Sequence, residues 1–544
     1  MTYAFDLGAY SRPTDTTPAA QAWLDRGLIW MFGYNHEEAI KCFEQAIAAD
    51  ARLALAYWGI AYSLGPNYNK PWEVFTDDEK SPCLENAHKT IQDGLAQANA
   101  GTLEHALLQA LLKRFPNDPD VEDFQPYLDD FADEMGVIYA GNPHDLEVVF
   151  AYAEALMGRT PWRLWDIFNG VPADGASTKI ARKVLETAFE SPAAWDHPGL
   201  LHMYIHLMEM SPTPQAALRH GDRLTGLCPD AGHLVHMATH IDVLCGDYQS
   251  VVARNHAAAA VDKKYKDYAG GQNFYSLYRI HNLHFEIYGA MFLAQKATAL
   301  KAAERLRAEV PDEVVRVYPD LFEVYVAARP HVFVRFGMWA EILDEPLPED
   351  TTLYASTNAL ILYSRAVALA NLGRPDAART EAAKFHAAYD AIPEERRLFQ
   401  NKARDVLAVA REMMMGEVAF KGGDTSAGLD HLREAVRLDD SLYYEEPWAW
   451  PQPTRHALGA LLLTAGHWDE AESVYRADLG LDGSIPRQLQ NPNNIWALQG
   501  LLECLEHRGE AVERVHIKQQ LDQAQARADI AVSASCFCRS SCPK

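Results

Sequence analysis

The spacing of small and apolar residues in this chain most constrains its fold, because it fits pairs of packed helices. In residues 20–65 such residues recur at helical intervals: Trp23, Gly27, Trp30, Ala39, Phe43, Ala46, Ala54, Trp58 and Ala61. Gly33 interrupts the first helix, and Asn35 with Glu38 three residues later forms a capping box that predicts the start of the next. The segment is expected to fold as helix, tight turn and helix.

Similar units recur, each broken by glycine, in residues 234–260, 361–390, 411–440 and 456–480. No Val/Ile/Thr-rich alternating segment competes with them, so strand content should be close to nil. These units resemble tetratricopeptide repeats (TPRs). The resemblance implies an all-α, TPR-like solenoid. Irregular insertions near residues 66–82, 115–125, 160–175 and 441–455 are expected to cover its concave face.

The length of the chain indicates more than one compact core. Its 544 residues exceed the roughly 250–300 at which a single core stops growing. We predict an N-terminal TPR-like half over residues 1–305, a C-terminal half over residues 306–530 and a disordered tail over residues 531–544, because termini are usually loose. The tail holds Cys536, Cys538 and Cys542, for which a soft-metal site or a redox pair is the alternative interpretation.

The charge argues against two classes of partner. A formal net charge of -26 repels phosphate backbones and anionic lipid, so we expect neither nucleic acid nor a membrane surface. Residues 1–13 have no apolar run after a basic region, and no stretch reaches the roughly 18–20 apolar residues of a spanning helix. The predicted location is cytoplasmic.

Three helical segments each carry a spaced pair of histidines. His202 and His206 lie four residues apart, with Glu209 three residues later. The other pairs are His236 with His240 and His281 with His284, whereas His233 is a weaker candidate because it can precede its helix. Residues at such intervals share one helix face, so two imidazoles can reach one metal ion.

We predict that these histidines bind a transition metal, because burying six imidazoles without partners is costly. Imidazole-rich coordination suits copper, zinc or iron, and the scarcity of carboxylates favours copper. A purely structural histidine network and a chance exposed arrangement are the alternatives. His36, at the first repeat turn, is a further ligand candidate, and Glu37, Glu154 and Glu209 are candidate proton acceptors or orienting groups.

A second resemblance rests on the segments YNHEEAIKCFEQA, YAEALM, HMYIHLME, GHLVHMATHI and HNLHF taken together. As a set they are similar to a widespread group of TPR proteins of bacteria and fungi with histidine motifs. The resemblance implies that His36, Glu37, Glu154 and the six paired histidines belong to the group pattern. Ala238 replaces the usual proline of the HLVHMATH segment.

The sequence therefore predicts a metal-dependent enzyme on a TPR scaffold, most simply a copper- or iron-dependent oxidoreductase acting on a small molecule. A protein-interaction scaffold holding a peptide in the concave groove, a zinc-dependent hydrolase and a metal-storage protein are the alternatives. A phosphate-binding loop, a nucleophile elbow and a dinucleotide fingerprint are absent from the sequence.

Overall fold

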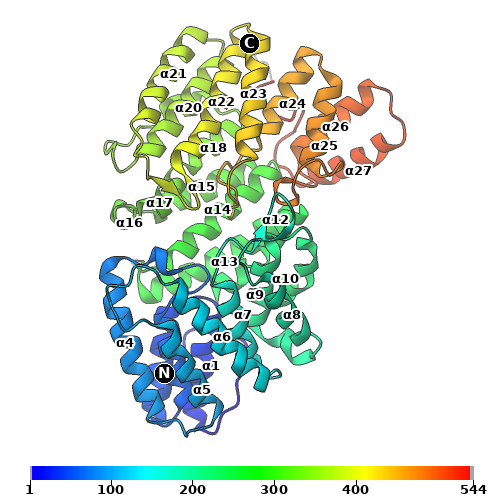
Figure 1. Cartoon of the computed structure of the whole chain (residues 1–544). Coiled ribbons are helices and arrows are strands. Elements are labelled where there is room, and N and C mark those ends of the chain that lie inside the picture. Colours follow the sequence, from blue (N-terminus) through cyan, green and yellow to red (C-terminus); the bar gives the residue numbers. More distant parts are fainter. Residues whose placement is uncertain (1–2, 272, 540–544) are drawn as a thin grey trace. The chain divides into compact units, whose positions relative to one another are not determined.

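The protein is a TPR-like helical array. The computed structural model describes residues 3–271 and 273–539, which are mostly helical (Figure 1). Strand pairing there is confined to two short antiparallel hairpins, β1 (Trp165–Asp166) with β2 (Val171–Pro172) and β3 (Arg397–Leu398) with β4 (Asn401–Lys402), and an isolated bridge between Asn67 and Lys70. The predicted all-α fold class is confirmed.

The chain divides into two compact units. Unit 1 takes in the residues up to Ile241 together with Ala260–Ala269, and unit 2 takes in Asp242–Ala259 and the residues from Gly270 onward. The boundary predicted at residue 305 stays a prediction.

Unit 1 is built from helices that each pack on the next. They are α1 (Pro18–Phe32), α2 (His36–Ala49), α3 (Ala54–Leu64), α4 (Asp77–Leu95), α5 (Leu103–Arg114), α6 (Gln125–Gly141), α7 (Leu146–Met157), α8 (Thr178–Ala188), α9 (Pro198–Glu209), α10 (Leu218–Thr225) and α11 (Gly232–His236). The predicted cap is present in part. Asn35 accepts a hydrogen bond from the backbone N–H of Glu38, but the Glu38 carboxylate bonds to Tyr3 and Lys41.

Glycines let large side chains lock neighbouring helices together. In unit 1 the Phe43 ring of α2 fills the space where side chains at Gly27 of α1 and Gly59 of α3 would otherwise stand. In unit 2 the Tyr475 ring fills the same kind of space at Gly459 and Gly500. This large-into-small packing sets the close approach of three consecutive helices, which is how a repeat array buries a continuous core.

Two helices, α12 (Thr239–Cys245) and α13 (Tyr248–Ala269), follow α11 in the chain. The helices of unit 2 continue from there, and in Figure 1 those from α20 to α26 stand in a row. They are α14 (Ser276–Phe292), α15 (Lys296–Glu309), α16 (Asp312–Val317), α17 (Pro319–Val326), α18 (Ala328–Arg335), α19 (Trp339–Asp344), α20 (Ala355–Asn371), α21 (Pro375–Asp390), α22 (Ala403–Lys421), α23 (Thr425–Asp439), α24 (Thr454–Ala465), α25 (Trp468–Leu479), α26 (Ile495–His507) and α27 (Glu513–Gln525).

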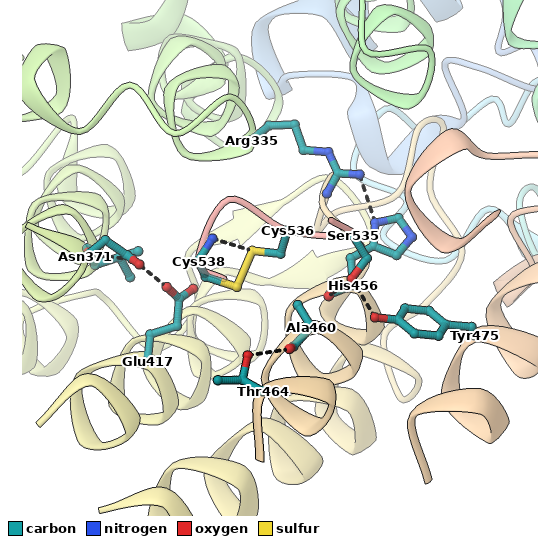
Figure 2. The surroundings of a disulfide bond; sticks show 11 residues. Arg335, Asn371, Glu417, His456, Ala460, Thr464, Tyr475, Ser535, Cys536 and Cys538 are labelled. Atoms are coloured by element: carbon teal, nitrogen blue, oxygen red, sulfur yellow. Dashed lines mark hydrogen bonds between the residues drawn. A yellow bond between two sulfur atoms is a disulfide. The ribbon is translucent and has the colours of Figure 1, made fainter. Parts of the chain in front are cut away.

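The C-terminal segment is packed on unit 2 as far as residue 539. The Ser535 hydroxyl donates to the His456 carbonyl at 2.9 Å, and Cys538 is buried. The prediction of a disordered tail is therefore wrong for residues 531–539, because these side chains have specific partners in the array; residues 540–544, with Cys542, lie outside the described residues. Figure 2 shows this segment over α24.

Across residues 3–271 and 273–539, helices that are both long enough and apolar enough to cross a bilayer are absent.

Replacing Gly59 with alanine tests the large-into-small packing, because the added Cβ would lie 2.5 Å from the Phe43 ring. Overpacking of this kind costs about 1–3 kcal/mol, so we expect Gly59→Ala to lower the melting temperature. Gly141→Ala is the matched control, since nothing lies within 4 Å of its added Cβ. Equal melting temperatures for the two variants would contradict the packing.

Glu417 of α22 gives unit 2 a pH dependence. Its buried carboxylate accepts a hydrogen bond from Asn371 at 2.8 Å (Figure 2), and burial raises the pKa of Glu417 from 4.5 to about 7. The folded state therefore binds the Glu417 proton more tightly than the unfolded chain does. The resulting contribution to the free energy of unfolding is complete below pH 4.5 and is lost as the pH rises through 7.

Glu417→Gln removes that dependence. The free energy of unfolding of the wild type, measured by denaturant titration, should fall by about 3 kcal/mol relative to Glu417→Gln between acidic and mildly alkaline pH. The exposed Glu394→Gln should track the wild type. A difference between wild type and Glu417→Gln that is constant with pH would show that the proton is not held as described.

Candidate metal centre

Helix packing forces polar side chains into the interior of unit 1. Helix α9 contacts α1, α7, α8 and α10, so every residue from Pro198 to Glu209 is buried. His202 and His206 lie four residues apart on this helix and are completely buried. His233 and His236 of α11, and His240 of α12, are also at most 2% exposed. The histidines that the spacing selected in unit 1 are thus core residues.

Three imidazoles come together at one point. The ligand nitrogens of His202, His206 and His233 all lie within 4.8 Å of one another, a grouping that could hold a metal ion. The Nε2 atoms of His202 and His233 are 3.2 Å apart. His233 was the weaker candidate from the sequence, yet α11 begins at Gly232, so its side chain is fixed by the helix.

Hydrogen bonds donated by Nδ1–H fix the tautomers of His202, His206 and His240. His202 Nδ1 lies 2.6 Å from the Phe32 carbonyl oxygen, which can only accept, so the ring donates from Nδ1. The Glu209 carboxylate accepts from Nδ1 of His206 at 2.9 Å and from Nδ1 of His240 at 2.6 Å. The Nε2 atoms of these rings therefore present lone pairs, as metal-binding histidines do.

A second pair of imidazoles continues from the first group. The Nε2 atoms of His236 and His240 are 2.8 Å apart, and the rings of His206 and His240 have centroids 5.7 Å apart. Because His240 Nε2 carries a lone pair, the proton between these rings comes from His236. Glu209 connects the two groups, since one of its oxygens bonds to each.

Burial keeps these rings neutral. It lowers the pKa of His206 to about 3. It also lowers the pKa of His202 well below the usual value, with a further contribution from the neighbouring His206. Neutral imidazole is the form that coordinates metals, so these rings do not have to release a proton before they bind one.

The aromatic rings that pack on these histidines, Tyr34 and Tyr68, could not be selected from the sequence. Tyr34 follows Gly33 in the turn between α1 and α2, with φ 56°. Its ring centroid lies 4.6 Å from that of His202, 5.7 Å from His233 and 6.3 Å from His206. Tyr68 packs on His206 at 4.7 Å. A positive φ recurs in the turns between later helix pairs, for example at Gly373 and Gly423, so this backbone conformation belongs to the repeat turn.

The other predicted residues of unit 1 differ in their surroundings. His36, the first residue of α2, bonds through Nδ1 to the Ser63 carbonyl at 2.9 Å, and burial lowers its pKa to about 3. Glu154 of α7 is buried, accepts a hydrogen bond from Tyr62, and has a raised pKa because of burial. Glu37 is exposed on α2, so the structure does not bring it into the buried group.

His281 and His284 lie on α14 in unit 2. The His281 ring packs on Phe285, with centroids 5.0 Å apart. His284 packs on Tyr325 at 5.2 Å, and burial lowers its pKa to about 4. Their predicted part in the metal centre stays a prediction.

Comparisons with known proteins add little to this geometry. No protein-family profile and no curated protein sequence match the chain. Among solved structures, the Cut9–Hcn1 hetero-tetramer of the APC/C is 13% identical, with 95% of this chain and 94% of that chain covered and a TM-score of 0.27.

Two further solved structures are similar at the same level. The TPR domain of P58(IPK) is 12% identical, with 93% and 98% covered and a TM-score of 0.22. The human IFIT1 dimer with m7Gppp-AAAA is 11% identical, with 93% and 96% covered and a TM-score of 0.32. Likenesses this weak carry no argument about function, and membership of the histidine-motif group stays a prediction.

Glu209→Gln tests the hydrogen-bond geometry. An amide has one accepting atom where the carboxylate has two, so an Nδ1–H of His206 or His240 must face an NH₂ group. Leaving a buried donor unsatisfied costs about 1–3 kcal/mol, and we expect a matching fall in the free energy of unfolding, measured with urea. The exposed Glu190→Gln should change nothing; equal stability of the two variants would show that Glu209 does not accept both bonds.

Proposed function

We propose that unit 1 binds a transition metal ion through His202, His206 and His233. The observation that carries the proposal is the arrangement of protons: Nδ1 of His202 and of His206 each donates to a fixed acceptor, which leaves both Nε2 lone pairs directed at one buried point. His202 Nε2 lies within hydrogen-bond distance of His233 Nε2, whereas His206 Nε2 is buried and has no hydrogen-bond partner among the described residues. A bound cation would satisfy the lone pairs of both rings at once.

The donor set supports copper first and zinc or iron second. Three neutral nitrogens in an interior without a thiolate suit Cu, Zn and Fe more than Mg or Ca. His240, held by the same Glu209, and His236 extend the centre by a second pair of imidazoles. His36, His281 and His284 are retained as ligand candidates that this proposal does not need.

We propose further that the centre acts as an oxidoreductase on a small molecule. Copper or iron would supply one-electron chemistry when bound, whereas zinc would support hydrolysis. Tyr34 covers one side of the histidines. Glu154 is buried on α7 and burial raises its pKa, so Glu154 is better suited than Glu209 to hold a proton. Both oxygens of Glu209 are already used in orienting His206 and His240.

A protein-interaction scaffold is the second candidate. It is favoured by the unbroken row of paired helices from α20 to α27 in unit 2, because repeat arrays of this kind present continuous helix faces to partners. A shallow surface site of about 610 Å³ lies along α27, lined by residues that include Val515 and Lys518. This role needs no metal.

Elemental analysis of the purified chain tests the metal proposal. We expect at least one tightly bound Cu, Zn or Fe per chain. His206→Ala combined with His240→Ala should keep the helical content, measured by circular dichroism, while losing that metal. His105→Ala, on α5 outside the group, is the matched control and should retain it.

Two results would contradict the proposal. Full metal occupancy in the His206→Ala, His240→Ala variant would exclude His206 as a ligand and with it the proposed centre. Wild-type protein that stays free of metal after loading with Cu, Zn or Fe would leave the scaffold as the function that the fold supports.

A further inference from the structure

The cysteines that the structure describes fall into two chemically different sets. Within residues 3–271 and 273–539, Cys42, Cys83, Cys228, Cys245 and Cys504 are single thiols. Burial raises the pKa of each to about 11 or 12. Because the thiolate is the reactive form, these five residues are unreactive near neutral pH.

Cys536 and Cys538 form the second set, a disulfide between residues only two positions apart (Figure 2). A bridge this local closes a very short loop, and the stabilisation that a disulfide provides grows with loop length. The pair therefore contributes little to holding the fold together. Bridges that stabilise little but remain within reach of solvent are the ones that exchange readily.

The tail around the pair is held by contacts that do not need the disulfide. The Ser535 hydroxyl bonds to the His456 carbonyl at 2.9 Å and lies 2.6 Å from the Tyr475 hydroxyl. The Phe537 ring occupies the space over Gly337 and packs near Trp496. These contacts hold the residues on either side of Cys536 without help from the disulfide.

The two sulfurs are not equivalent. Cys536 is half-buried, whereas Cys538 is completely buried. The backbone N–H of Cys538 donates to Cys536 Sγ at 3.1 Å, an interaction that favours negative charge on that sulfur. Cys536 is thus the sulfur that a thiol can reach and the one better able to carry a thiolate.

We propose that Cys536 and Cys538 form a thiol–disulfide exchange site for low-molecular-weight thiols, with Cys536 as the exchanging sulfur and Cys538 as the resolving one. A thiolate attacks Cys536 Sγ, the S–S bond breaks, and Cys538 leaves as a thiolate that takes a proton. A second thiolate attacks the mixed disulfide, which releases the oxidised small thiol and Cys536. Two thiols lose two electrons, and the protein disulfide gains them.

Glutathione is the probe for the test, with every variant made in the full chain carrying Cys542→Ser so that the pair is observed alone. Native protein is equilibrated with mixtures of reduced and oxidised glutathione, quenched with acid and alkylated, and its thiols are counted by intact mass. Two thiols should appear together as the reduced share rises. Cys504→Ser is the control and should leave this transition unchanged.

The single variants assign the two roles. With oxidised glutathione and no denaturant, Cys538→Ser should gain one glutathione at Cys536. Cys536→Ser should react at about one tenth of that rate or below, because Cys538 is buried. Equal rates for the two variants would overturn the assignment. A pair that is fully alkylated without reductant, or that stays oxidised until the protein unfolds, would overturn the proposal itself.

Discussion

A buried neutral imidazole with a fixed hydrogen-bond acceptor is held in one tautomer, and the candidate metal centre depends on this constraint. In water a histidine can change tautomer freely, but inside unit 1 the acceptors are fixed by helices. The Phe32 carbonyl at the end of α1 accepts a hydrogen bond from Nδ1–H of His202, and the two oxygens of Glu209 accept from Nδ1–H of His206 and of His240. These three bonds leave the Nε2 lone pairs of His202, His206 and His240 in fixed directions. Glu209 links the two groups of rings, because it bonds to His206 in one and to His240 in the other.

The helical array makes those fixed acceptors available. Close approach of α1, α2 and α3 around Phe43 requires the glycines at positions 27 and 59, and α9 is buried by its contacts with α1 and three other helices. A looser array would leave His202 and His206 with water as a partner and with no reason to keep one tautomer. The packing of the repeats thus determines the chemistry of the histidines, because it sets the dielectric and the geometry around them.

Periodicity alone was sufficient to predict the helices and the histidine pairs of α9 and α11–α12. Helical spacing reports which residues share a face, so His202 with His206 and His236 with His240 could be selected without coordinates. It does not report where a helix begins, which is why His233 was underrated, or what a turn residue packs against, which is why Tyr34 was missed. The order of residues 531–539 also escaped prediction, because it depends on contacts with His456 and Tyr475, far away in sequence.

X-ray absorption spectroscopy of the metal-loaded chain tests the central claim most directly, because it identifies the atoms around the metal. We predict a first shell of imidazole nitrogens at about 2.0 Å, with the outer-ring scattering typical of histidine and no sulfur at about 2.3 Å. A shell containing sulfur would place the metal at cysteines, and a shell of oxygens alone would place it at surface carboxylates. Either result would contradict binding by His202, His206 and His233.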